Sequence, residues 1–459
     1  MENEMGDESV NIQGLCIASI RREPFDIVFK VGSQKTRFLC HKTMFCENSR
    51  VFFRLYGTLN EEPIVINIED VSKEAFLIIV RYVYQRELFM RFEYIVEVLL
   101  LASRYQMMKL KSEVLFYVNQ RINDRNAVSI LSQFEHFNER LIKGHHSLQK
   151  VKQIALNTID KFGICSLLGF QFSMLRKDTI ALILERDTLR IKEFTLIQCA
   201  IAWAKDECGR RNLEQNLENI RMVLGSVFYL IRFPLLTIED LFAVYSSGLL
   251  IKEDEFNLLL NYLIETQKPT LPFNTLSRAE LGYKLNRFKN QKVSTEKHKP
   301  REFHQIDIKV TQNIRLVAIG VYMPKGYQEI CGSLAMFLEL YNSRTQQRIA
   351  QMSRRMICGP PLNAQIFQFV FTSCIFLQPN HRYSIVLCIR YFNLRRNIRD
   401  FIVIEGTSGK PTITQKPKHE QKVVWTFKMP KVTFGPLARE RNKSNIFSGQ
   451  FPEIIYDLK

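Results

Sequence analysis

The spacing of apolar residues changes along the chain, and the changes predict three folded segments. Residues 24–120 mix short runs of β-branched and aromatic residues with apolar positions at helical spacing, which predicts an α/β segment. Residues 121–265 keep the helical spacing throughout, which predicts an all-α segment. Residues 301–459 alternate apolar and polar positions in many short runs separated by turn residues, which is typical of an all-β sandwich or barrel.

The α/β segment opens with a predicted hairpin. Phe25–Val31 and Thr36–Cys40 have strand composition on either side of a short turn, and Ile64–Ile68 has the composition of a third strand. Ser72 then precedes a predicted helix, and its hydroxyl is a suitable N-cap. The apolar face of that helix is predicted to consist of Phe76, Ile79, Val80 and Val83.

The all-α segment offers two further predicted N-caps, Asp124 and Asp178. Its predicted core stripe consists of Phe194, Ile197, Ile201 and Ala204, with Trp203 beside it. Between this segment and the β-rich one, residues 266–300 carry prolines and then a basic run, which predicts a basic, flexible linker. The alternative for this run is an electrostatic arm for phosphate surfaces.

Composition locates the charge. The 459 residues are 46% hydrophobic and 24% charged, which is ordinary for globular proteins and excludes a disordered or fibrous chain. The net charge is +18, but residues 1–277 hold 34 basic and 34 acidic residues, whereas residues 278–459 hold 30 and 12. The whole basic excess therefore belongs to the β-rich end, and residues 1–23 are predicted to be an acidic, flexible N-terminus.

Cysteine spacing and the start of the chain bear on the compartment. The closest two of the ten cysteines are six residues apart, which speaks against a zinc ribbon and a disulfide scaffold. The first residues are acidic and lack the apolar core of a signal peptide, and no apolar run is long enough to span a membrane. We therefore expect a soluble protein in the cytoplasm, with the nucleus as an alternative.

Motifs that carry catalytic chemistry are not found. The sequence contains no GxGxxG, GxxxxGK[ST], GxSxG or HExxH, and His145-His146 has no further potential ligand within a helical turn. We therefore predict a non-enzyme without a cofactor or metal.

The α/β segment resembles a BTB/POZ domain. Asp26–Val31 is similar to that family's first-strand motif D-V-x-F-x-V, and Phe38–Lys42 is similar to I-P-A-H-K, with Cys40 in place of the usual Ala. Phe76–Tyr84 and Leu101–Tyr105 are similar to F-x-x-L-L-x-Y-x-Y and A-A-x-K-Y.

The other two segments resemble domains that follow BTB domains. Ile201–Cys208 and Leu224–Pro234 look like parts of a BACK domain. Ala318–Tyr322 and Ser448–Tyr456 are similar to the opening G-L-G-L-Y and the closing G-G-Q-I-P-E-I-I-F-Y of a PHR domain. The resemblance implies a multidomain chain with an α/β BTB/POZ domain, an all-α BACK helical domain and an all-β PHR-like sandwich.

This domain order resembles the BTB-domain-containing adaptor subfamily. The resemblance implies a non-catalytic substrate-recognition adaptor of a cullin-3 RING E3 ubiquitin ligase. Its expected partners are cullin-3, a second copy of the chain and a protein substrate held by the sandwich. The alternative is a dimeric BTB scaffold without cullin binding, whose basic C-terminal domain binds an acidic partner or nucleic acid.

The resemblance also implies contact residues. In the family, the cullin contact is a hydrophobic-x-Glu signature after the third BTB helix, which Leu59 and Glu61 match, and Tyr105 matches an aromatic position on that face. An apolar anchor beside a carboxylate combines packing with a charge-assisted hydrogen bond. Packing among the BTB helices is the alternative role of Tyr105.

Three polar residues match positions near the dimer interface of the family, and stabilisation of the fold is their alternative role. They are Asp26, His41 and Lys42.

The basic end has its own predicted surface, made by Arg354, Arg355, Arg395, Arg396 and Arg399. It suits an acidic protein partner, nucleic acid with Tyr391 and Phe392 available for stacking, or an anionic membrane surface. A dispersed positive charge is also compatible with a merely solvated surface.

Overall fold

The structure is a computed structural model, and it divides the chain into two compact units, Met1–Glu185 and Arg186–Lys459. The boundary between them falls inside the predicted all-α segment. The structure describes residues 9–10, 25–59, 63–265, 267–297, 301–323, 333–357, 366–392, 400–417, 422–435 and 442–458.

The first unit contains the predicted hairpin and third strand. Its sheet has the order β1-β3-β2-β4, in which β2 and β3 pair antiparallel while β2 and β4 pair parallel. Gly32, with φ +73°, makes the turn of the hairpin. The strands are β1 (Ser9–Val10), β2 (Ile27–Val31), β3 (Thr36–Cys40) and β4 (Ile64–Ile68).

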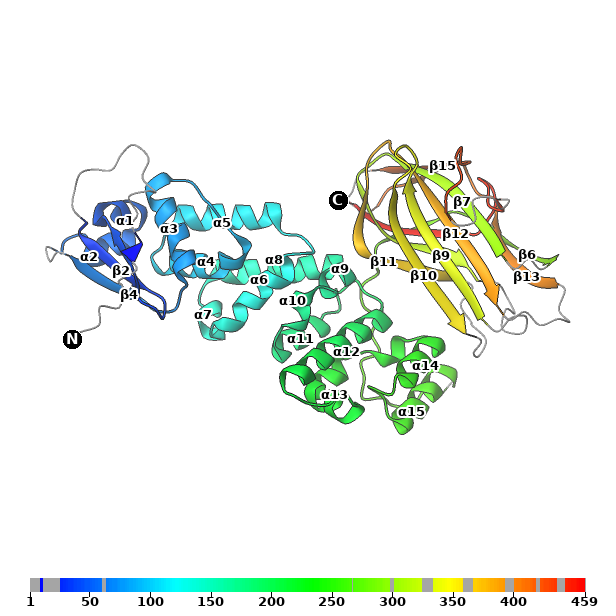
Figure 1. Cartoon of the computed structure of the whole chain (residues 1–459), viewed down its shortest axis with the longest axis horizontal. Coiled ribbons are helices and arrows are strands. Elements are labelled where there is room, and N and C mark those ends of the chain that lie inside the picture. Colours follow the sequence, from blue (N-terminus) through cyan, green and yellow to red (C-terminus); the bar gives the residue numbers. More distant parts are fainter. Residues whose placement is uncertain are drawn as a thin grey trace, which may run out of the picture. The chain divides into compact units, whose positions relative to one another are not determined.

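Helices pack against this sheet and continue beyond it (Figure 1). The helices up to residue 121 are α1 (Lys42–Asn48), α2 (Arg50–Tyr56), α3 (Lys73–Gln85), α4 (Ile95–Arg104) and α5 (Met108–Arg121), with the 3₁₀ turn Phe92–Tyr94. The others are α6 (Ala127–Gln133), α7 (Glu139–Lys143), α8 (His146–Phe162), α9 (Ile164–Leu167), α10 (Phe170–Ser173) and α11 (Lys177–Leu184), with the 3₁₀ turn Phe134–His136.

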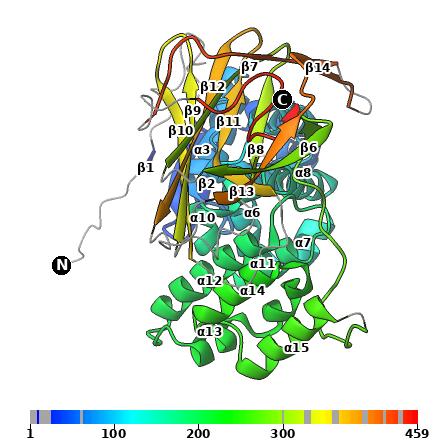
Figure 2. The same cartoon turned by 90° about the vertical axis from the view of Figure 1, so that its right-hand side faces the viewer.

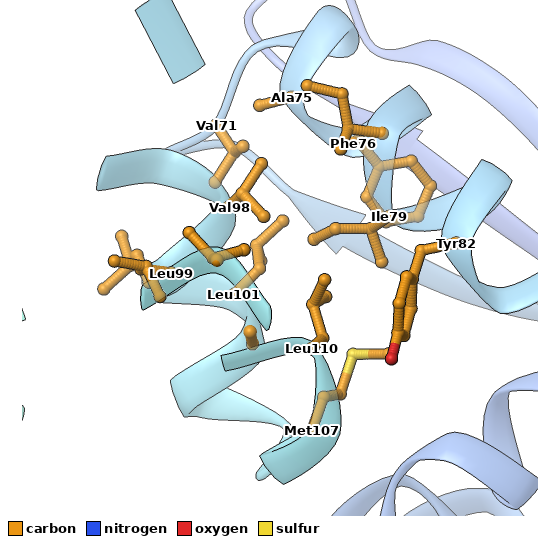
Figure 3. Packing of buried hydrophobic residues seen from close by; sticks show 14 of the residues in the cluster. Val71, Ala75, Phe76, Ile79, Tyr82, Val98, Leu99, Leu101, Met107 and Leu110 are labelled. Atoms are coloured by element: carbon orange, nitrogen blue, oxygen red, sulfur yellow. The ribbon is translucent and has the colours of Figure 1, made fainter. Parts of the chain in front are cut away.

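The predicted cap of α3 is confirmed. The Ser72 hydroxyl accepts a hydrogen bond from the Ala75 amide at 3.3 Å, and the four predicted apolar residues of this helix are buried. Side chains of α3 meet those of α4 and the start of α5 in one core (Figure 3). The other two predicted caps are wrong, because Asn126 precedes α6 and Arg176 precedes α11.

The second unit starts with helices and ends in a β-sandwich. Its helices are α12 (Glu193–Arg210), α13 (Leu217–Leu224), α14 (Ile238–Ser246) and α15 (Glu253–Ile264), with 3₁₀ turns at Gly225–Leu230 and Phe233–Leu235. Of the predicted core stripe, Ile197 and Ala204 are buried whereas Phe194 and Ile201 are only partly buried, and Trp203, predicted beside the stripe, is buried. No helix among the residues that the structure describes is both long enough and apolar enough to cross a membrane.

Two sheets form the sandwich, and their inner faces share one apolar core. The larger has the order β10-β9-β12-β7-β15-β14 and the smaller β11-β8-β16-β5, while β13 and β6 form a separate two-stranded sheet. Strands β10, β9, β12 and β7 run side by side (Figure 1 and Figure 2). The strands are β5 (Tyr283–Asn286), β6 (Asn290–Lys297), β7 (Arg301–Val310), β8 (Ile314–Tyr322), β9 (Ser333–Asn342), β10 (Arg348–Ile357), β11 (Ile366–Leu377), β12 (Arg382–Phe392), β13 (Asp400–Thr407), β14 (Thr412–Gln415), β15 (Val423–Lys428) and β16 (Glu453–Leu458).

The prediction of a flexible linker at 266–300 is wrong at residues 283–286 and 290–297, which form β5 and β6. The segment before them is also held to the helices. The Arg278 guanidinium pairs with Glu193 of α12 at 2.8 Å, both side chains being buried, and Arg232 donates to the Leu276 carbonyl at 2.9 Å. Of the basic run, β5 pairs with β16 of the sandwich and β6 pairs with β13.

Candidate functional site

Helix α2 begins at a cap that ties it to the end of α4. The Ser49 hydroxyl accepts a hydrogen bond from the Phe52 amide at 2.8 Å and donates one to the Tyr105 carbonyl. Phe52 is buried beneath the helix, where its ring lies 5.8 Å from the ring of Tyr105 and 4.8 Å from that of Tyr56. The sequence thus places two tyrosines against one buried phenylalanine.

Leu59 lies in the turn that follows α2. Its amide donates to the Tyr56 carbonyl at 3.2 Å, and its own carbonyl accepts from Lys42 Nζ at 2.8 Å. Its side chain remains 40% exposed. The backbone of this turn is therefore fixed while its apolar side chain faces solvent. Glu61, the second residue of the predicted cullin signature, lies outside the described residues.

Tyr105 is half-buried, and burial raises the pKa of its hydroxyl. Its ring packs on Phe52, which supports a role in the packing of these helices. Tyr105 lies beside the start of α2, where its carbonyl accepts from Ser49, and Leu59 lies in the turn after the end of α2. A contact role for Tyr105 stays a prediction.

The three residues predicted near the dimer interface have partners within the chain. Asp26 Oδ1 accepts from the Lys42 amide at 2.6 Å, at the start of α1. The His41 amide donates to Tyr84 Oη at 2.8 Å, and its ring Nδ1 lies 2.9 Å from the same oxygen. These contacts support their role in stabilising the fold, and a part in dimerisation stays a prediction.

Sequence reasoning missed two exposed apolar residues on α2. Phe53 is 58% exposed and Leu55 is 52% exposed, close in sequence to Leu59. Phe53 also lines a shallow hollow with Cys46, Arg50, Arg54 and Thr58. The available signal was an excess of apolar residues, since Val51 to Tyr56 contains more than one helix face can bury.

The predicted basic surface is divided by the structure. Arg354 and Arg355 are neighbours on β10, so their side chains point to opposite faces. Arg354 lies over the ring of Phe194 in α12, at 5.7 Å, whereas Arg355 lies over Phe392 at 5.4 Å. Tyr391 is buried in the sandwich core, which excludes it as a stacking platform. Arg395, Arg396 and Arg399 lie outside the described residues.

Comparison with domain families accounts for the three segments. The BTB/POZ domain matches residues 19–122, the domain described as BTB And C-terminal Kelch matches residues 141–245, and the PHR domain matches residues 286–457. The chain therefore contains BTB/POZ, BACK and PHR domains, in that order. The PHR match begins at the end of β5, in agreement with the strands found where a linker was predicted. None of the three family descriptions names a catalytic activity.

Curated relatives match part of the chain. BTB/POZ domain-containing protein 6-A of Danio rerio is 28% identical over 311 residues, which cover 66% of this chain and 55% of the relative. BTB/POZ domain-containing protein 3 of Homo sapiens is 27% identical over 302 residues, which cover 65% of this chain and 56% of the relative. The chain thus spans about half the length of the curated relatives it matches.

One solved structure, the BTB domain of zebrafish PATZ1, is 18% identical and covers 21% of this chain and 76% of its own, with a TM-score of 0.18. Leu59, Tyr105 and the exposed residues of α2 all belong to the BTB domain, and Arg355 belongs to the PHR domain.

Proposed function

We propose that this chain is a non-catalytic adaptor that brings a protein substrate to a cullin-3 ubiquitin ligase in the cytoplasm. In this proposal the BTB domain binds cullin-3 and a second copy of the chain, and the PHR sandwich holds the substrate. The BTB–BACK–PHR order supports an adaptor, because it joins a domain of the self-associating BTB family to a separate domain of a different fold.

One observation carries the cullin part of the proposal. Leu59 has its backbone held by two hydrogen bonds while its side chain is exposed, and Phe53 and Leu55 expose further apolar surface nearby. A preorganised apolar anchor loses little conformational freedom on binding, which favours a protein contact over a solvated loop. Glu61 follows two residues later in the sequence and supplies a carboxylate for a charge-assisted hydrogen bond.

The test is capture of cullin-3 by the full chain. Leu59→Ala combined with Glu61→Ala should abolish co-purification of cullin-3, while light scattering shows that the oligomeric state is unchanged. The matched control is Glu87→Ala combined with Phe89→Ala, which removes an exposed carboxylate and an exposed ring two residues apart elsewhere in the BTB domain.

Two outcomes would count against the proposal. Unchanged capture by the Leu59 and Glu61 variant would remove this turn from the cullin contact. Failure of the unaltered chain to capture cullin-3 would favour a BTB scaffold without a ligase.

A further inference from the structure

Three arginines lie in one row across the larger sheet of the sandwich. In the strand register, Arg355 of β10 is opposite Ala335 of β9, Ala335 is opposite Arg390 of β12, and Arg390 is opposite Arg301 of β7. Residues directly opposite each other share a face of the sheet. Neighbouring strands lie about 4.8 Å apart, so the three intervals from β10 to β7 make the row about 14 Å long. We call Arg301, Arg355 and Arg390 the arginine row.

The row lies on the outer face of the sandwich. Leu334 and Met336, the neighbours of Ala335 on β9, both belong to the core between the sheets, so Ala335 points the other way. Phe337 lies two residues after Ala335 on β9 and therefore on the same face, and it packs against a separate hydrophobic cluster outside that core. Arg301 and Arg355 are exposed, and Arg390 is partly exposed.

Aromatic rings support two of the guanidinium groups. Arg355 lies over Phe392 and Arg390 lies over Phe337, each 5.4 Å from the ring centroid. A guanidinium that rests on a ring keeps its planar edge of N–H donors available for a carboxylate. Arg355 also donates to the Ser333 hydroxyl at 3.5 Å. The rings and the hydroxyl restrict the two side chains before any partner binds.

Two carboxylates at strand positions near the arginine row are already paired with cations outside the row. Glu302 follows Arg301 on β7, but it points to the opposite face and pairs with Lys443 at 2.9 Å. Glu339, on the same face as the row, is buried and pairs with Arg348 at 3.1 Å. Among the described residues, no carboxylate forms an ion pair with the arginine row, so its positive charge is left for a ligand.

We propose that the arginine row binds an acidic segment of a protein partner, with carboxylates of that segment held by the edges of the guanidinium groups. The proposal rests on the adaptor function and names the chemistry of its substrate. A protein is favoured over single-stranded nucleic acid because bases would need free aromatic faces. Tyr391 is buried, and one arginine covers one face each of Phe392 and Phe337.

The test measures binding of a fluorescein-labelled deca-glutamate peptide to the full chain by fluorescence anisotropy at low salt. Removing two charge-assisted contacts in Arg301→Gln with Arg355→Gln should weaken binding about tenfold or more. The matched control, Arg344→Gln with Lys428→Gln, removes the same charge from exposed positions outside the row and should bind as the unaltered chain does. The single change Arg355→Lys keeps the charge but loses the planar fork, so it should also weaken binding.

Three results would overturn the inference. Deca-glutamate could fail to bind, both double variants could weaken binding equally, or labelled deca-thymidine could bind more tightly than deca-glutamate and depend on the row. Cullin-3 capture by the same proteins separates this inference from the proposed function. A chain that captures cullin-3 but ignores deca-glutamate overturns the inference alone, and the reverse result overturns the ligase role alone.

Discussion

At the scale of single residues, Ser49 connects the start of α2 to the end of α4. Its buried hydroxyl caps α2 at Phe52 and donates to the Tyr105 carbonyl, so one side chain satisfies two backbone groups. Ser49→Ala would leave both without that partner. We expect the free energy of unfolding of the BTB domain to fall by about 1–3 kcal/mol, measured by chemical denaturation.

The control for that change is Ser112→Ala on α5. Its hydroxyl is exposed and donates only to the Lys109 carbonyl one turn earlier. We expect this variant to change stability by less than about 0.5 kcal/mol. Equal stability of the two variants would show that the Ser49 cap contributes nothing beyond an ordinary surface serine.

Single residues also show what the sequence could predict about the site. Leu59 could be located only through its place in a family motif, because a lone Leu-x-Glu pattern has no structural meaning by itself. The division between Arg354 and Arg355 follows from strand alternation and was predictable once β10 was assigned. The arginine row could not be predicted from the sequence, because it depends on the register between β10, β9, β12 and β7. That register is set by pairing between strands that are distant in the sequence.

At the scale of elements, the segment before β5 is fixed by a buried ion pair. Arg278 Nε lies 2.8 Å from Glu193 Oε2, and both side chains are nearly inaccessible. Arg278→Ala would leave the Glu193 carboxylate buried without its cation, which costs about 3–5 kcal/mol in such sites. We expect a lower denaturation midpoint for the second unit and faster proteolysis between residues 266 and 282.

A second variant separates the loss of charge pairing from the loss of packing. Arg278→Met with Glu193→Gln removes both charges. It keeps a side-chain oxygen that can accept the hydrogen bond that the Arg232 amide donates to Glu193 Oε1 at 2.7 Å. This pair should recover much of the lost stability, since the buried charge is gone. If the double variant is as unstable as Arg278→Ala, the ion pair is not the cause.

The same segment explains why the linker prediction was wrong. Strand β5 is four residues long, and Leu285 is its only buried residue, so the local pattern is weak. Its partner β16 lies at the far end of the chain, and Lys284 of β5 pairs with Glu453 of that strand. A basic run with a distant acidic partner looks like a solvated connector when only the local sequence is considered. The strands β3 and β4, by contrast, carry local alternation and were predicted with their bounds.

At the scale of the whole molecule, the second unit joins the last BACK helices to the PHR sandwich. Asp457 of β16 is buried and pairs with Arg315 of the sandwich and with Arg190, which precedes α12, at 2.9 Å. Arg278 and Glu193 form a further ion pair in this unit, which holds the segment before β5 to α12. The compact unit therefore starts at Arg186, although the sequence alone places a domain boundary near residue 266.

This arrangement makes a prediction about fragments. A fragment of residues 186–459 keeps Arg190 and Glu193 and should unfold in one cooperative thermal transition. A fragment of residues 266–459 loses both, so Asp457 keeps only Arg315 as a partner and Arg278 loses the Glu193 carboxylate. Because the loss of these partners lowers stability, we expect the shorter fragment to melt at a lower temperature, by about 2–4 °C per kcal/mol lost. Equal melting temperatures, measured by calorimetry at one concentration and salt, would show that the sandwich is stable without the helices and that the sequence-based boundary is the functional one.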